Sequence, residues 1–114
     1  MALHYNLSKV YEISENDDDF VMAIVSLFVT EVLGDLLLVK EGINEGNHQQ
    51  AYAYAHKIKP SLDLLGLTTA FEEVLQIEQW GKNLGKRKEI IEIYKSLEHQ
   101  IEKAVKEIKK DFEV

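Results

Sequence analysis

Apolar residues recur at steps of three and four along most of the chain, which is the period of one helix face. In the middle of the chain this stripe consists of Ala51, Ala55, Ile58, Leu62 and Leu65. Near the end it consists of Ile90, Tyr94, Leu97, Ile101, Ala104, Val105, Ile108 and Phe112. The pattern predicts amphipathic α-helices, and the alternating Val, Thr and aromatic patches typical of strands are missing.

Capping and turn residues place the ends of the expected helices. Ser8 is positioned to cap a brief helix through Glu12, and Asn16 and Asp17 precede a second helix that should reach about Lys40. The glycine-containing segment 42–47 then predicts a turn. Further helices are expected from about His48 to Gly66, over 67–82 and over 87–112.

For two of these helices the sequence makes more specific predictions. Pro60 falls inside the helix that begins near His48, where a proline removes a backbone hydrogen bond and normally kinks the rod. In the next helix, the inward positions are expected to be Leu67, Phe71, Val74 and Leu75.

Four long amphipathic helices joined by short turns are typical of an antiparallel up-down-up-down bundle. We therefore expect an all-α fold, with a short N-terminal helix ahead of the four-helix bundle, in a single domain over residues 1–114. One proline and six glycines in 114 residues agree with long helices and few loops. No heptad seam is left unsatisfied, so we expect a monomer.

Composition narrows the class of partner. The net charge of −7 argues against nucleic acid and membrane surfaces, which basic patches bind. There is no cysteine, hence no disulfide and no thiolate metal site. The apolar stretch 20–39 contains Glu31 and Asp35, and each acid at the bilayer centre costs about 2.5 kcal/mol or more. A bundle helix is therefore the better interpretation, and without a visible signal peptide we expect a cytoplasmic protein.

His56 is the residue around which chemistry is expected. At about 100° per residue it lies roughly 140° from the apolar stripe of its helix, on the solvent side. Its neighbours on this flank and on the outer face of the helix are Tyr52, Lys57, Lys59, Pro60, Asp63 and Leu64. An ordinary surface histidine among lysines would give the same local pattern.

Glu78, on the following helix, makes an ordinary surface histidine a less favoured interpretation of His56. It continues the inward series of Leu67, Phe71 and Val74, so its carboxylate needs a partner. An imidazole N–H would be suitable, because a carboxylate that holds one ring nitrogen fixes the tautomer and leaves the other nitrogen as nucleophile. A lysine partner, or a place at the wet end of the helix pair, would satisfy Glu78 equally well.

The segment 55–67, AHKIKPSLDLLGL, resembles the signature of histidine phosphotransfer (HPt) domains. That signature has a histidine on a helix, a lysine three residues later, a small residue four later and a glycine ten later, which here are His56, Lys59, Pro60 and Gly66. The resemblance extends to chain length and helical architecture over about residues 15–112. It departs from the family at Pro60, where a glycine is usual.

The resemblance implies that His56 accepts a phosphoryl group from an aspartyl phosphate and passes it on, within a multistep two-component phosphorelay. Glu78 would hold Nδ1–H so that Nε2 is phosphorylated, while Lys59 and Lys57 offset the phosphoryl charge. The partners implied are response-regulator receiver domains, which supply Mg²⁺, and a (hybrid) histidine kinase. The protein itself would be a phosphocarrier with neither a cofactor nor autonomous kinase activity, either as a stand-alone protein or as a piece of a larger kinase. The residues expected to bind the partners are Tyr52, Pro60, Asp63, Leu64 and Gly66.

A helical bundle of this kind could also hold a metal centre or act as an adaptor. Metal centres in helical bundles use paired Glu-x-x-His motifs, but the one such spacing here, Glu45 to His48, straddles a turn at Gly46. We therefore expect no metal site. The alternative function is a helical-bundle adaptor that binds signalling proteins without being phosphorylated. The presence of His56, Lys59 and Gly66 argues against it, because an adaptor does not need the nucleophile.

Overall fold

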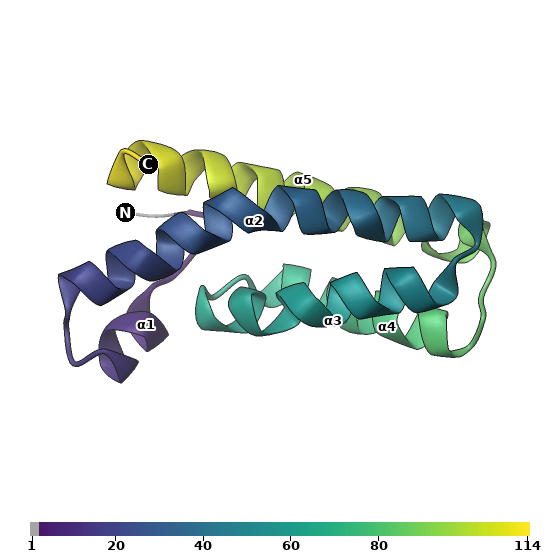
Figure 1. The fold of residues 1–114 in the computed structure, drawn as a ribbon, viewed down its shortest axis with the longest axis horizontal. Helices are drawn as coiled ribbons and strands as arrows, with labels where there is room; N and C mark the ends of the chain where they lie inside the picture. The colour runs from purple at the N-terminus through teal and green to yellow at the C-terminus, as the bar shows by residue number, and fades with distance from the viewer. Residues whose placement is uncertain (1–2) are drawn as a thin grey trace.

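The computed structural model describes residues 3–114, in which there are five helices and no strand. The helices are α1 (Ser8–Ile13), α2 (Asp18–Glu45), α3 (His48–Leu64), α4 (Thr68–Lys82) and α5 (Arg87–Phe112) (Figure 1). The predicted all-α class is confirmed, as is the short helix ahead of four long ones.

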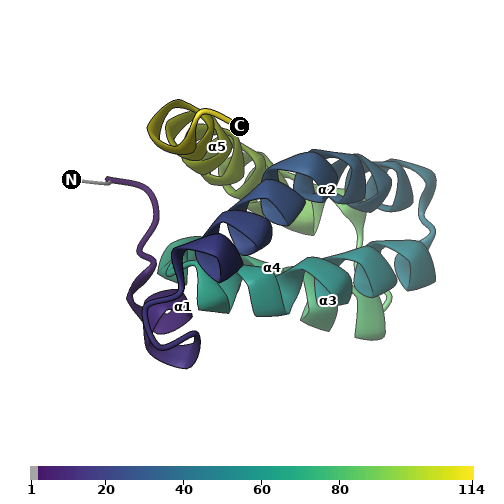
Figure 2. The same cartoon turned by 60° about the vertical axis from the view of Figure 1, so that its left-hand side comes forward.

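The long helices pack as an elongated bundle of 43 × 23 × 19 Å. One layer contains α2 and α5, and the other contains α3 and α4, as two views of the molecule show (Figure 1 and Figure 2). Each long helix contacts one helix in its own layer and one in the other, because α2 and α4 both contact α3 and α5. The short helix α1 contacts the beginning of the bundle through α2.

Helix α2 is longer than its sequence pattern predicts. Its start agrees with the prediction, since the Asp17 side chain accepts hydrogen bonds from the backbone N–H of Asp19 and of Phe20. The expected end near Lys40 is wrong, because the helix continues to Glu45 and ends at Gly46 with φ +70°. Residues 42 and 43 are buried against the bundle, and this packing outweighs the low helix propensity of glycine.

The core includes the stripes expected on α3 and α5. The predicted residues 51, 55, 58, 62 and 65 are buried, and so are those of the α5 stripe, except for the half-buried Phe112. On α4, Leu67 and Val74 are buried and Phe71 is half-buried. The expectation that Leu75 points inward is wrong, since this side chain is exposed. It follows Val74 directly and is therefore turned about 100° away from the buried stripe.

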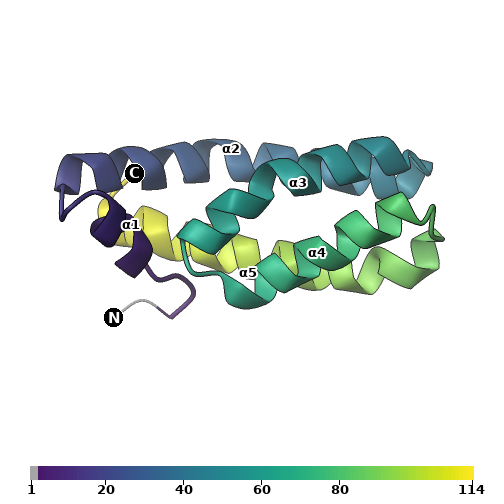
Figure 3. The same cartoon turned by 90° about the horizontal axis from the view of Figure 1, so that it is seen from below.

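The N-terminal segment lies against the ends of α3 and α5 (Figure 3). The backbone N–H groups of Leu3 and His4 donate to the Glu107 carboxylate, and the Asn6 N–H donates to the Leu65 carbonyl at 2.8 Å. Ser8 does not cap α1 as expected. It is the first helical residue, and its N–H donates to the Asn6 side chain at 2.8 Å.

By length and composition, α2 is apolar enough to cross a membrane, a property that it shares with the core helices of many soluble proteins. In its most apolar stretch, 39% of the residues are buried inside the bundle. Its exposed apolar side chains are Phe20, Met22, Leu27, Leu33 and Leu37. One face of α2 therefore serves the core, while apolar surface is left on the others.

Candidate functional site

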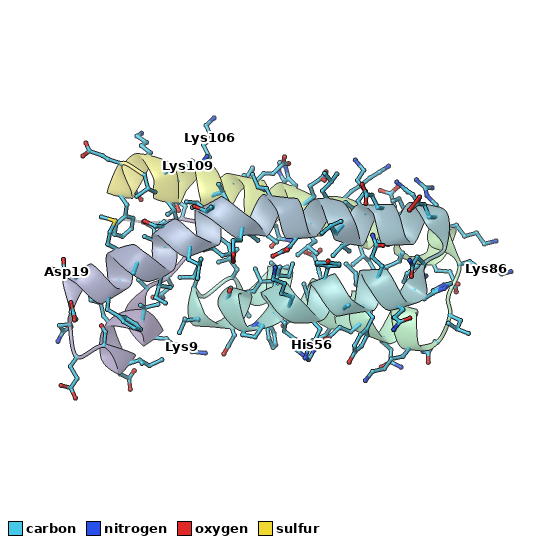
Figure 4. All side chains as sticks on the ribbon, in the orientation of Figure 1. Lys9, Asp19, His56, Lys86, Lys106 and Lys109 are labelled. Carbon is cyan, nitrogen blue, oxygen red and sulfur yellow. The ribbon has the colours of Figure 1, made fainter. Side chains whose placement is uncertain are left out.

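His56 stands on the outer surface of the layer formed by α3 and α4. The buried residues of α3 are Ala51, Ala55, Ile58 and Leu62, and His56 lies on another flank, where its ring contacts Glu78 of α4. Figure 4 shows the side chain projecting from α3 away from α2 and α5. With 60% of its side-chain surface exposed, the imidazole is accessible to another protein.

The buried carboxylate of Glu78 holds one nitrogen of this ring. Glu78 Oε2 lies 2.7 Å from His56 Nδ1, and only 8% of the Glu78 side chain is exposed. Because a carboxylate oxygen accepts and the ring N–H donates, the hydrogen bond places the proton on Nδ1. The second ring nitrogen, Nε2, then carries its lone pair on the exposed side of the ring.

Lys59 binds the other oxygen of the same carboxylate. Its ammonium group donates to Glu78 Oε1 at 3.0 Å, and 25% of its side chain is exposed. The sequence left three possibilities for Glu78, and the structure contains two of them together, the imidazole and the lysine. The third, a place at the end of the helix, does not apply, because α4 continues to Lys82.

Lys57 lies on the other flank of α3. Its ammonium group donates to Asp35 Oδ1 of α2 at 2.9 Å, in the groove between α2 and α3. The hydrogen bond to Asp35 and the negative charge of that carboxylate raise the pKa of Lys57 above its ordinary value. The sequence placed both lysines near His56, but the ammonium group of Lys57 is engaged on the side of α3 that faces α2.

The residues expected to bind a partner differ in what they contact within the molecule. Pro60 is exposed within the uninterrupted helix α3, and Leu64 lines the groove toward α2. Asp63 forms an exposed ion pair with Lys9 of α1 at 2.8 Å. Tyr52 stacks on the His56 ring, with centroids 5.8 Å apart and planes at 7°.

Gly66 has a structural reason to be glycine. Its φ of +72° is a left-handed conformation that favours glycine, and a Cβ there would lie 2.7 Å from the Asn6 side chain. The N-terminal segment therefore packs on the turn between α3 and α4 only because residue 66 has no side chain. This accounts for the glycine ten residues after the histidine without any contact to a partner.

A groove between α2 and α3 is lined by Lys57, on the flank of α3 that does not carry His56. It has a volume of about 110 Å³, and its apolar walls include Ile24, Leu27, Ile58 and Leu64. The sequence predicted a bundle helix over the apolar stretch 20–39 but did not identify Asp35 as the partner of Lys57. A lone buried acid in an apolar helix was the available signal, because such a carboxylate requires a cation or a donor nearby.

Within residues 3–114, no group of three or more His, Asp or Glu side chains is placed so that it could hold a metal ion. No family model, curated protein or solved structure matches this chain. The arrangement of His56, Glu78 and Lys59 is therefore the basis on which a function is proposed.

Proposed function

We propose that this protein is a histidine phosphotransfer protein of a multistep two-component phosphorelay, with His56 as the phosphoryl carrier. The observation that carries the proposal is the exposed imidazole whose Nδ1 is held by a buried carboxylate at 2.7 Å. A buried carboxylate bound to one ring nitrogen holds the exposed imidazole in one orientation, which a nucleophile requires. The same hydrogen bond fixes the tautomer in which the exposed Nε2 is nucleophilic.

The fold proposed with this function is an antiparallel up-down-up-down four-helix bundle in a single domain. The contacts of α2 and α4 with both α3 and α5 support it, and so do the short connections between successive helices. In such a bundle α3 and α4 are neighbours throughout. Their proximity holds the nucleophile and its orienting carboxylate on one rigid surface.

The chemistry requires no group beyond those that the two proteins supply. The Nε2 lone pair attacks the phosphorus of an aspartyl phosphate on a receiver domain, the P–O bond breaks, and the aspartate carboxylate leaves. The Nδ1 proton stays on the ring, whose positive charge is offset by Glu78. The reverse sequence passes the phosphoryl group to a second receiver domain, and Mg²⁺ belongs to the receiver.

Among the two candidate lysines, we assign the charge role to Lys59. It contacts the carboxylate that orients His56, so its ammonium group is close to the site. Lys57 is held by Asp35 on the flank toward α2. The cation and the oriented nucleophile are what phosphoryl transfer needs, because its catalysis is mostly positioning and electrostatics.

The partners proposed are receiver domains and a (hybrid) histidine kinase, and we propose that neither nucleic acid nor a membrane is a partner. The protein would act as a monomer in the cytoplasm. The apolar groove between α2 and α3 supports docking of a protein partner, since exposed apolar surface is typical of such interfaces. Leu27, which is 56% exposed, and Leu64 line this groove.

The test is phosphoryl transfer from a phosphorylated receiver domain to the wild-type protein, to His56→Gln and to His99→Gln. His99 is an exposed histidine on α5 and serves as the matched control. We expect acid-labile label on the wild type and on His99→Gln and none on His56→Gln. Label that persists on His56→Gln would mean that another residue is the carrier. If the receiver domain binds but transfers no phosphoryl group to any of the three proteins, the adaptor function would be favoured.

A further inference from the structure

The imidazole of His56 has a second neighbour besides Glu78. Tyr52 lies one turn earlier on α3, and its ring is nearly parallel to that of His56, with an interplanar angle of 7° and centroids 5.8 Å apart. Offset stacking of this kind is a favourable arrangement for two rings. The hydrogen bond to Glu78 fixes one atom of the imidazole, but rotation of a histidine ring about its last bond is otherwise soft.

Helix α4, which carries Glu78, also holds Tyr52 in place. Gly81 is buried, and a Cβ there would lie 3.2 Å from Tyr52 Cβ and 3.1 Å from the His48 carbonyl, so the absence of a side chain lets α3 approach closely. Lys82 places its ammonium group 5.5 Å from the centroid of the Tyr52 ring, a cation–π distance. Two consecutive residues of α4 therefore restrain the tyrosine.

We propose that Tyr52 is a positioning residue that fixes the plane of the His56 imidazole for phosphoryl transfer. This inference rests on the proposed function. Glu78 sets the tautomer, and Tyr52 sets the plane in which the bond between Nε2 and phosphorus must lie. The stack thus directs the phosphoryl group along one line, instead of the range of directions open to an exposed ring held at a single atom.

The experiment compares the wild type with Tyr52→Leu and Tyr52→Phe. Tyr54→Leu is the matched control, because Tyr54 lies on the same helix, is half-buried, and has a lysine 6.0 Å from its ring centroid. Nitrogen and proton NMR of the imidazole reports its tautomer and the ring current of its neighbour. The rate of phosphorylation by phosphoramidate, in which Nε2 displaces ammonia from phosphorus, reports reactivity without a partner protein.

We expect Tyr52→Leu to lose the ring-current shift of the His56 protons, to keep the tautomer that Glu78 sets, and to be phosphorylated about three- to tenfold more slowly. Tyr52→Phe keeps the ring and should retain all three properties. Tyr54→Leu should leave the His56 resonances and the rate unchanged. Circular dichroism and thermal melting establish that each variant is folded, and rescue by phenylalanine separates positioning from a loss of stability.

A Tyr52→Leu protein that is folded, and that is phosphorylated at the wild-type rate, would overturn the inference. So would a slower rate in Tyr52→Phe equal to that of Tyr52→Leu, because the stacked ring would then not be responsible. If the wild type itself takes no phosphoryl group from phosphoramidate or from a receiver, the proposed function fails. In that case the ring-current shift of the His56 protons in the wild type and in Tyr52→Phe, relative to Tyr52→Leu, still tests the stack, and its absence would overturn the inference.

Discussion

At the scale of single residues, the site depends on one buried carboxylate that serves two partners. Each oxygen of Glu78 accepts one hydrogen bond, from His56 on one side and from Lys59 on the other. A buried acid with only a neutral imidazole beside it would keep an uncompensated charge. Lys59 therefore stabilises the fold through the same contact that supports the orientation of His56.

Replacing Lys59 tests this coupling. We expect Lys59→Ala to lower the free energy of unfolding by about 1–2 kcal/mol, which is less than for a fully buried pair because a quarter of the lysine side chain is exposed. Lys9→Ala is the matched control, since the ion pair of Lys9 with Asp63 is exposed on both sides and should change stability by about 0.5 kcal/mol or less. Urea unfolding measures both, and equal effects would contradict the coupling.

Pro60 makes the backbone near His56 weaker than in an ordinary helix. It lies inside α3 and lacks the N–H that would donate to the carbonyl four residues earlier, which is that of His56. We expect Pro60→Ala to raise the free energy of unfolding by about 1–2 kcal/mol, after allowing for the entropy that proline removes from the unfolded chain. Chemical denaturation measures the change, and a loss of stability would show that proline is the better residue there.

At the scale of helices, the close approach of α2 and α3 depends on a single glycine. A Cβ at Gly42 would lie 2.7 Å from the backbone nitrogen of Ala51 and 2.9 Å from the carbonyl oxygen of Asn47. Backbone atoms of this kind cannot move aside as a flexible side chain can. The packing at Gly42 also explains why α2 extends beyond its expected end.

Alanine at two glycines of α2 should have opposite effects. Gly42→Ala is expected to lower the free energy of unfolding by about 1–3 kcal/mol, because the helices must separate to admit the methyl group. Gly34→Ala, where a Cβ would meet nothing within 4 Å, should raise it by about 0.5–1 kcal/mol through better helix propensity. Thermal and urea unfolding measure the stability of both variants. Changes of the same sign in Gly42→Ala and Gly34→Ala would contradict this reasoning.

At the scale of the whole molecule, the N-terminal segment joins the end of α3 to the last helix. Glu107 on α5 accepts hydrogen bonds from two backbone N–H groups of the segment, and Tyr5 donates to Asp111 at 2.7 Å. Partial burial acts to raise the pKa of Glu107, but the hydrogen bonds from Leu3 and His4 and the charge of His4 outweigh it and lower the pKa. The segment is therefore attached by a carboxylate in its ionised form.

The direction of this shift predicts how the attachment depends on pH. A carboxyl group with a lowered pKa in the folded state contributes stability above its unfolded value, and that contribution is lost as the pH falls through the folded value. We expect Glu107→Gln to be less stable than the wild type at neutral pH, with the difference shrinking as the pH falls below 4.5. Urea unfolding across this range measures it, and a difference independent of pH would contradict the role of the charge.

Much of the molecule could be predicted from the pattern of its residues. Periodicity identified the helices and their buried stripes, and it placed His56 on a solvent-facing flank and Glu78 on an inward one. These are properties of one helix at a time, and they follow from 3.6 residues per turn. The glycines and the N-cap residue Asp17 added several of the helix ends.

The tertiary structure decided which residues of different helices meet. The rotation of α4 about its axis and its offset along α3 brought Glu78 to both His56 and Lys59, and they turned Leu75 outward. The pairing of Lys57 with Asp35 likewise depends on how α2 and α3 lie together. Sequence periodicity shows which face of each helix is buried, but it does not show how two helices are placed relative to each other. That placement results from the packing of all the side chains between the helices.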